Sequence, residues 1–445
     1  MDYISINDQE KKEMFSSIGV SKAEDLFSVI PEKAKVKGLN LPKGLSEQEL
    51  VSKFEILAGK NISLKQMKSF RGAGIYEHFI PSLVDEITGR SEFLTAYTPY
   101  QAEASQGTLQ TIFEYQSLIT QLTGLDVANA SMYDGASALA EAALVSIRST
   151  GKKKLLVSSA LHPEYFQVLK TYLQGLAIDI KTIPLDGGNT STKDLKNLFD
   201  PDTASVIIQS PNFFGQIEDL EEIKKLCEPA GFLLISVVNP ISLGILKSPG
   251  EAGSDICVGE GQVLGNPSGM GGFTFGFMSC KQSLAWKMPG RIVGQTTDTK
   301  GRRGFVLTLQ SREQHIRREK ATSNICTNSA LNALAGCVYL SGWGPEGFKK
   351  LSTLNLSKSR YAFEEIIKIK GFSAAFSNHN FFNEFVIKTT KDVNKLQSKL
   401  LDEKILGPLE LEKFFPEFKN CLLFCVTEAR TKKDIDKLVD ILKEC

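Results

Sequence analysis

Histidine is scarce in this 445-residue chain, and its four histidines (His78, His162, His315 and His379) are not spaced as a pair. The eight cysteines are scattered, and no CxxC pair occurs. Because a zinc site needs several such ligands at close spacing, we expect no metal site. The cysteines are better explained as buried free thiols, which behave as small hydrophobic side chains.

The chain also lacks an excess of charge of either sign. Lys and Arg number 52 and Asp and Glu number 51, so the net charge is 52 − 51 = +1. This balance gives no general attraction to nucleic acid or to an anionic membrane. No segment reaches the ~20 apolar residues of a membrane-spanning helix, and the charged start MDYISINDQEKKEM lacks the apolar core of a signal peptide. We expect a cytoplasmic protein that binds neither nucleic acid nor membrane.

Strand-like and helical patterns alternate through the middle of the chain. Apolar runs at 153–159, 205–210 and 231–238 lack a clean polar alternation, which suits a parallel sheet covered on both faces. Repeated strand–helix–strand units imply right-handed crossovers in an open α/β sheet. The sequence therefore predicts three parts: an N-terminal helical arm over 1–60, a large α/β domain over 61–340 and a C-terminal α+β small domain over 341–445.

Two capping boxes mark expected helix starts. Ser46 is followed three residues later by Glu49, and Ser311 is followed by Gln314. In this motif the first residue caps the helix and the fourth bonds back to it. We expect a long helix to begin near Ser311.

A large α/β domain followed by a small α+β domain is typical of fold-type I pyridoxal-phosphate enzymes. In that fold a loop before a helix presents backbone N–H groups and hydroxyls to the cofactor phosphate. The segment DGAS, which begins at Asp134 and ends at Ser137, precedes such a helix here. Asp134 and Ser137 are therefore candidates for vestigial contacts to the cofactor.

Two groups that this cofactor requires are missing. An Asp should keep the pyridine nitrogen protonated, but the strand LLISVV is followed by Asn239 and Pro240. A lysine should form the imine, but the stretch from Asp255 to Gly272 contains none. We therefore expect no Schiff-base lysine in this chain. Two other glycine-bearing stretches, RGAG at 71–74 and GNPSGMGG at 265–272, are expected to form tight turns rather than nucleotide-binding loops.

Four long segments carry a specific family resemblance: Ser69–Val84, Phe93–Ala143, residues 259–277 and Phe305–Asn328. They closely resemble the alpha subunits (subunit 1) of two-chain glycine dehydrogenases (decarboxylating), which correspond to the N-terminal half of the P-protein of the glycine cleavage system. The match continues through FNEFVIK and CVTEARTKKDID, so it covers nearly the whole chain.

The resemblance implies an oxidoreductase, the aminomethyl-transferring glycine dehydrogenase. In that family glycine binds as an imine of pyridoxal phosphate, loses its carboxylate as CO2 and passes its aminomethyl group to the lipoyl arm of the H-protein. The resemblance also implies an α2β2 assembly in which the beta subunit carries the cofactor covalently. This chain would then be active only in complex with that beta subunit.

A dense polar segment is the best candidate for a site contributed by this chain. Tyr97, Tyr100, Gln101 and Glu103 surround a proline turn. Phenol and amide donors can orient the carboxylate that leaves from glycine, so we predict that these four residues line the shared active site. The alternative is a capped turn whose tyrosines pack at the subunit interface.

A cationic cluster follows later in the chain and contains Arg312, His315, Arg317 and Arg318. Such arginines can hold an anion or form ion pairs on a helix face, and we favour a structural or interface role. Two rival functions remain. An independent pyridoxal-phosphate enzyme is disfavoured by the missing Asp and Lys, and a non-enzymatic pseudoenzyme is disfavoured by the polar segment at 97–106.

Overall fold

The computed structural model describes residues 5–36, 38–269 and 272–445. The chain divides into two units, residues 1–62 and residues 63–445. Part of the predicted turn at 265–272 lies outside the described residues. Within the described ranges, no helix is long and apolar enough to cross a membrane.

The first unit is built from helices α1 (Asp8–Ser17) and α2 (Glu47–Ala58), with short 3-10 turns between them. The predicted capping box at Ser46 is confirmed, because Ser46 N–H donates to Glu49 Oε2 at 2.8 Å and Glu49 N–H donates to Ser46 Oγ at 3.3 Å. Neither helix contains a buried residue. The unit therefore has no core formed by these two helices.

The second unit contains a seven-stranded central sheet with the strand order β2-β10-β9-β8-β7-β3-β4. Its strands are β2 (Val127–Ala128), β3 (Lys154–Ser158), β4 (Asp179–Ile183), β7 (Thr203–Gln209), β8 (Leu233–Val238), β9 (Ile256–Glu260) and β10 (Gly276–Cys280). All neighbours pair in parallel except β10, which is antiparallel to both β9 and β2. The predicted mostly parallel α/β sheet is confirmed.

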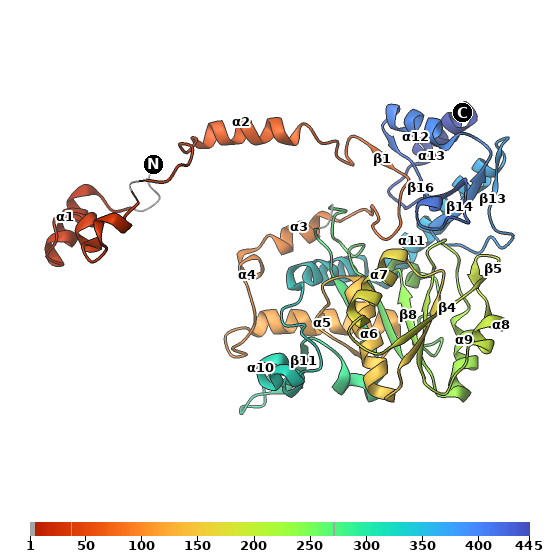
Figure 1. Ribbon diagram of the computed structural model, residues 1–445, viewed down its shortest axis with the longest axis horizontal. Coiled ribbons are helices and arrows are strands. Elements are labelled where there is room, and N and C mark those ends of the chain that lie inside the picture. Colours follow the sequence, from red (N-terminus) through yellow and green to blue (C-terminus); the bar gives the residue numbers. More distant parts are fainter. Residues whose placement is uncertain (1–4, 37, 270–271) are drawn as a thin grey trace. The chain divides into compact units, whose positions relative to one another are not determined.

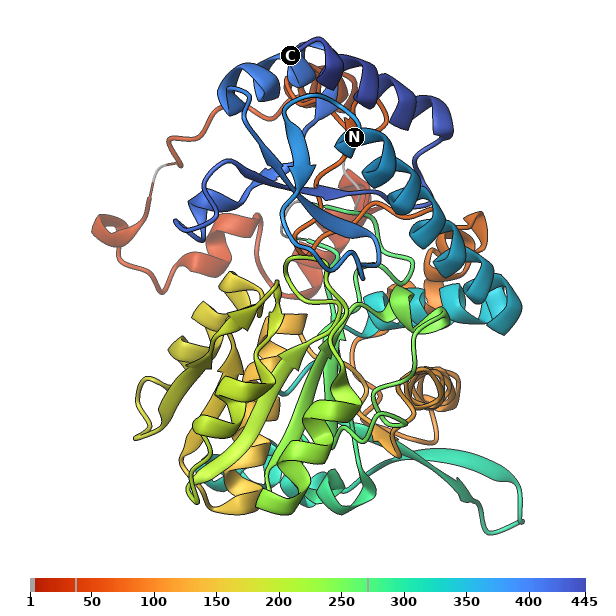
Figure 2. The same cartoon turned by 90° about the vertical axis from the view of Figure 1, so that its right-hand side faces the viewer.

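Helices cover both faces of this sheet, as Figure 2 shows. Alternate residues of β3 point to opposite sides: Leu155 and Val157 pack with α6 (Gly135–Thr150) and α7 (Pro163–Leu173), whereas Leu156 packs with α8 (Thr192–Asn197) and α9 (Leu220–Cys227). Helices α5 (Gln106–Thr123) and α11 (Ala330–Ile367) pack on strands β8 to β10. The apolar strands are buried on both faces, which explains why they lack polar alternation.

The C-terminal part forms a second, antiparallel sheet at one end of the central sheet (Figure 1). Its strand order is β13-β14-β17-β16, with β13 (Phe372–Ala374), β14 (Glu384–Thr389), β17 (Cys421–Cys425) and β16 (Leu409–Glu410). Helices α12 (Val393–Asp402) and α13 (Lys432–Lys443) complete its core with the end of α11. Strand β1 (Lys68–Ser69) pairs with β15 (Ile405–Leu406), so the chain visits this part before it enters the central sheet.

The long helix expected near Ser311 begins instead at Ala330, so that prediction is wrong. Residues 310–320 form only short turns, and the predicted capping box at Ser311 does not form. Arg312 explains the difference, because its buried guanidinium donates to the carbonyl oxygens of Gly290 at 3.0 Å and of Met288. This side chain fixes the local backbone beside another loop, and a continuous helix would move it away.

Candidate functional site

The carboxyl ends of the parallel strands meet at one edge of the central sheet, where open α/β sheets bind their ligands. A small hollow of ≈ 30 Å³ lies at this edge. Residues at or after the ends of four strands line it, namely His162 after β3, Gln209 at the end of β7, Asn239 after β8 and Glu260 at the end of β9. This is the place where a cofactor would be expected in such a fold.

The N-terminus of α6 faces the same region, but the two polar side chains there, Asp134 and Ser137, already form hydrogen bonds with each other's backbone. Ser137 N–H donates to Asp134 Oδ1 at 2.6 Å, and Asp134 N–H donates to Ser137 Oγ at 3.2 Å, which makes a capping box. The two residues predicted as vestigial cofactor contacts thus bond to each other. Their contact with a cofactor stays a prediction.

The carboxylate of Glu260 lies at the N-terminus of α6, where the helix dipole favours negative charge. It accepts hydrogen bonds from the backbone N–H groups of Gly135 at 3.0 Å, Gln262 at 2.9 Å and Phe275 at 3.3 Å. Burial raises the pKa of this carboxyl group to about 7, against the lowering effect of these hydrogen bonds. A side chain of this chain therefore stands where α6 would otherwise hold an anionic group of a ligand.

The RGAG segment (71–74) contributes Gly74 to the lining of the same hollow. His162 Nδ1 accepts a hydrogen bond from Glu164 N–H at 3.2 Å, so its Nε2 carries the hydrogen and donates to Ala73 O at 2.9 Å. The imidazole stacks on Tyr165 with ring centroids 4.9 Å apart, and burial lowers the pKa of His162. Gly74 has a φ of +104°, and a Cβ atom there would lie 2.9 Å from His162 Nε2.

Glu384 of β14 holds this segment from the other side. It is buried, its Oε1 accepts from Ala73 N–H at 2.7 Å, and its Oε2 accepts from the Tyr76 hydroxyl at 2.6 Å. Burial raises the pKa of Glu384 to about 7. The segment is thus fixed between the central sheet and the C-terminal part.

We expect the urea midpoint of unfolding to fall as the pH rises from about 4.5 to about 7, in part because of Glu384. Its folded-state pKa lies above its ordinary value of 4.5, so its contribution to stability is complete below pH 4.5 and is lost as the pH rises through 7. The contribution is on the order of 3 kcal/mol. Glu384→Gln cannot ionise and should flatten this part of the profile, measured between pH 5 and pH 8. The exposed Glu346→Gln serves as the control, and an unchanged profile in Glu384→Gln would contradict the assignment.

Lysine does not line the hollow within the part of the chain that the structure describes. The two lysines that flank the lysine-free stretch bond elsewhere. Lys247 forms an ion pair with Glu221, and Lys281 Nζ lies 2.6 Å from Asp255 Oδ1. Sites for ligands of cofactor size measure roughly 300–1,000 Å³, so the hollow of ≈ 30 Å³ does not fit pyridoxal phosphate.

The structure places the predicted site segment on an exposed loop before α5, and none of its residues lines the hollow. Tyr97 and Tyr100 are 78% and 68% exposed. The Tyr100 ring lies 5.6 Å from the Arg291 guanidinium carbon, and Arg291 Nη1 lies 3.4 Å from Thr98 Oγ1. The side chains of Gln101 and Glu103 are exposed on the same loop. The four candidates therefore lie together on one exposed loop.

Gln106 fixes the end of this loop against strand β12 (Arg303–Thr308) of a hairpin with β11 (Ile292–Thr297). Its Nε2 donates to Ala102 O at 2.7 Å and to Phe305 O at 2.8 Å, and its Oε1 accepts from Phe305 N–H at 2.9 Å. Of the cationic cluster, only Arg312 is buried, while His315, Arg317 and Arg318 are exposed. The hydrogen bonds of Arg312 to Met288 O and Gly290 O are structural contacts. The structural or interface role of the other three residues stays a prediction.

Neither Glu260 nor Glu384 is among the site residues predicted from the sequence. Glu260 offered a signal, because it is an acidic residue between two glycines directly after the apolar run ICV. No local sequence signal points to Glu384, because its partners Ala73 and Tyr76 lie more than 300 residues away in the chain.

Comparison with known proteins connects this architecture to a family. The family model described as glycine cleavage system P-protein matches residues 1–442. The probable glycine dehydrogenase (decarboxylating) subunit 1 of Endomicrobium trichonymphae is 58% identical over 445 residues, which are 100% of each chain.

Solved structures point to the same family. The crystal structure of glycine decarboxylase (P-protein) of the glycine cleavage system, in inhibitor-bound form, is 41% identical with a TM-score of 0.90 and covers 100% of both chains. A sphingosine-1-phosphate lyase of Burkholderia pseudomallei is 13% identical with a TM-score of 0.68 over 93% of this chain and 94% of its own, which shows a shared fold alone. The predicted fold-type I architecture is confirmed, and the chain belongs to the glycine cleavage system P-protein family.

Proposed function

We propose that this chain is the alpha subunit of a two-chain glycine dehydrogenase (decarboxylating) and forms one side of an active site whose pyridoxal phosphate is bound covalently by a beta subunit. The relatives named subunit 1 and the P-protein crystal structure support the reaction. The observation that supports the division of labour is the filled hollow, where Glu260 faces the start of α6 and no described lysine is present. Pyridoxal phosphate supplies the electron sink for decarboxylation when the partner binds it.

The contribution of this chain is to orient glycine. Tyr97, Tyr100, Gln101 and Glu103 offer two hydroxyls, an amide and a carboxylate on a loop that Gln106 fixes to β12. Groups held in this way can keep the glycine carboxylate in the geometry from which CO2 leaves. Their exposure in the isolated chain supports a place at a surface that a second chain completes.

The proposed enzyme contains two kinds of subunit. We infer an α2β2 heterotetramer that passes the aminomethyl group to the lipoyl arm of the H-protein. The relatives' designation as subunit 1 supports a second subunit. We place the complex in the cytoplasm, because all eight cysteines are free, as expected in a reducing compartment.

Reduction with borohydride in the presence of pyridoxal phosphate should label the partner and not this chain. The reason is that no lysine among the described residues lines the hollow, and the measurement is peptide mapping after reduction of each subunit and of the complex. Glycine–bicarbonate exchange should require both subunits. Stoichiometric labelling of one lysine in this chain, or exchange by this chain alone, would refute the proposed division.

A further inference from the structure

Arg291 lies directly before strand β11 and is buried next to the exposed loop at 97–103. Its carbonyl oxygen accepts a hydrogen bond from Ala130 N–H at 2.8 Å, and the carbonyl oxygen of the preceding Gly290 accepts one from Arg312 Nη2 at 3.0 Å. The backbone at Arg291 is therefore fixed to two other segments. Its side chain is only 6% exposed, and a charged group buried to this extent needs partners that compensate it.

The guanidinium of Arg291 connects a buried carboxylate with the exposed loop. Its Nε lies 3.9 Å from Oε2 of Glu313, whose side chain is 7% exposed. Its Nη1 lies 3.4 Å from Thr98 Oγ1, and its carbon Cζ lies 5.6 Å from the centre of the Tyr100 ring. A cation within ≈ 6 Å of a ring centre is attracted to the ring. Arg291 thus attaches the loop to the rest of the molecule at Thr98 and at Tyr100.

Few other polar contacts hold this part of the loop. Tyr100 N–H donates to Thr98 O at 2.9 Å, which is a bond within the loop itself. In the part of the chain that the structure describes, the Arg291 contact with Thr98 is the only hydrogen bond from another segment to residues 97–101. Apart from the packing of Pro99, which is buried, the place of Tyr100 therefore depends on Arg291.

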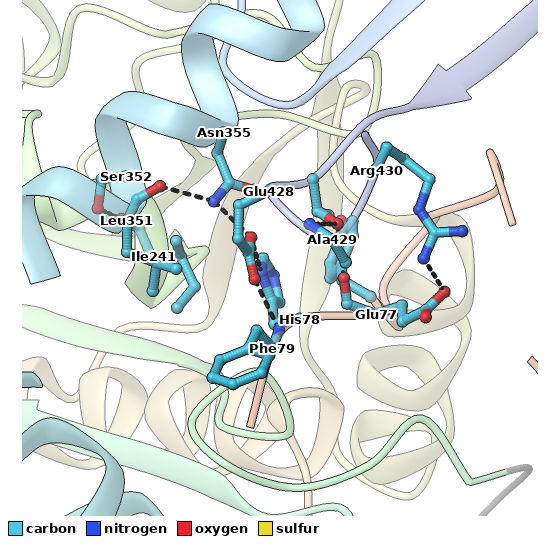
Figure 3. Close-up of polar contacts among 12 residues, drawn as sticks. Glu77, His78, Phe79, Ile241, Leu351, Ser352, Asn355, Glu428, Ala429 and Arg430 are labelled. Carbon is cyan, nitrogen blue, oxygen red and sulfur yellow. Dashed lines mark hydrogen bonds and ion pairs between the residues drawn. The ribbon is translucent and has the colours of Figure 1, made fainter. Parts of the chain in front are cut away.

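Another buried charge shows how a complete structural cluster is built in this molecule (Figure 3). Glu428 Oε2 lies 2.8 Å from His78 Nδ1 and accepts a hydrogen bond from Asn355 Nδ2 at 2.8 Å. Its Oε1 accepts from Phe79 N–H at 2.7 Å, so short contacts satisfy both oxygens. By contrast, the guanidinium of Arg291 has several N–H donors but makes one hydrogen bond within the described residues, at 3.4 Å. Arg291 therefore holds the loop without locking it, as suits a segment that must adapt to a second chain.

We propose that Arg291 is a positioning residue: anchored by Glu313, it sets the place of the Tyr100 hydroxyl in the assembled active site. The inference rests on the proposed function, in which Tyr100 helps to orient glycine. Arg291 acts through the loop and not by contact with glycine. A displacement of about 1 Å in an orienting group can slow a reaction on the order of 10²-fold, so the rate should depend on the residue that holds the loop.

Limited digestion of the isolated full-length chain tests this hold without any assay of activity. Chymotrypsin cleaves after tyrosine, and local opening of the backbone sets the rate of cleavage. The variant Arg291→Met is made together with Glu313→Gln, so that no buried charge is left unpaired. It should raise the rate of cleavage after Tyr97 and Tyr100 by about fivefold or more. Cleavage after the exposed Tyr172 of α7 in the same digest should not change.

The matched control is Arg303→Met, because the Arg303 guanidinium carbon also lies 5.6 Å from the centre of a ring, that of Phe305. This control should keep the cleavage pattern of the parent. Unchanged cleavage of the loop in the Arg291 variant would overturn the proposal. An equal rise at Tyr172 would also overturn it, because it would show a general loosening of the fold.

Glycine–bicarbonate exchange by the assembled enzyme then connects the hold on the loop to the reaction. The double variant of Arg291 and Glu313 should slow exchange at saturating glycine by about 10-fold or more. Arg291→Lys alone keeps a cation beside the Tyr100 ring and should lose less. In a chain that already carries Tyr100→Phe, the double variant should cost less than about twofold, because the hydroxyl to be positioned is gone.

The outcomes separate this inference from the proposed function. Exchange that the double variant leaves unchanged, or lowers by the same factor with and without Tyr100→Phe, would overturn the positioning role and leave the proposed function intact. A parental rate in Tyr100→Phe alone would refute the part that the proposed function gives to Tyr100, and the positioning role with it.

Discussion

Removal of residues 1–62 is expected to abolish co-elution of this chain with its partner subunit and to leave the fold of residues 63–445 intact. The cut falls at the boundary between the two units of the structure. Helix α2 has apolar side chains with no core to bury them, since Phe54 is 60% exposed and Ile56 70%. Exposed apolar surface of this kind marks a protein contact, and burying each such side chain contributes roughly 1.5–3 kcal/mol.

Size-exclusion chromatography of the mixed subunits is the measurement, with circular dichroism and thermal unfolding of the truncated chain to show that residues 63–445 still fold. A single substitution sharpens the test. Phe54→Asp should weaken the complex by about 30-fold or more, the scale of an interface hot spot, whereas Lys53→Asp beside it on the same helix should have little effect. If the truncated chain still co-elutes, the first unit is not the interface element proposed here.

Much of the fold could be predicted because its signals are local. Strand β7 is TASVIIQ and strand β8 is LLISVV, apolar runs rich in β-branched residues that indicate buried strands regardless of their neighbours. The helix at Ser46 is equally local, because its cap is satisfied by Glu49 three residues away. The backbone conformation around Ser311 is not determined by neighbouring residues. Arg312 donates hydrogen bonds to carbonyl oxygens more than 20 residues away in the chain, and these contacts outweigh the helical pattern of the sequence.

The candidate site shows the same division. The absence of a lysine between Asp255 and Gly272 could be read directly from the sequence. The residues that form the hollow and hold the segment beside it could not be predicted from the sequence. Glu260, Gly74 and Glu384 come together only after the central sheet and the C-terminal part have packed. The glycines of the RGAG segment illustrate this point. They suggested a tight turn, but a Cβ atom at Gly72 would lie 2.4 Å from Glu384 Oε1, so close packing across the molecule also requires glycine there.

Loss of either phenolic hydroxyl of the exposed loop is expected to slow glycine–bicarbonate exchange by the assembled enzyme roughly 10²-fold. Tyr97→Phe and Tyr100→Phe each remove one donor and keep the ring. A preorganised donor that acts mainly in the transition state contributes on this scale. The ring of Tyr100 should still lie over Arg291, 5.6 Å away in the structure, so the loop should keep its position.

Three measurements separate chemistry from packing in these variants. Co-elution with the partner and the visible spectrum of the cofactor should match those of the parent, while the exchange rate falls at saturating glycine. Tyr172→Phe is the matched control, because Tyr172 is also exposed but lies on α7, outside the loop. Parental exchange rates in both variants would assign the loop to the subunit interface. Weakened co-elution with unchanged exchange per assembled complex would lead to the same conclusion, because a catalytic hydroxyl must affect the rate of the complex that has formed.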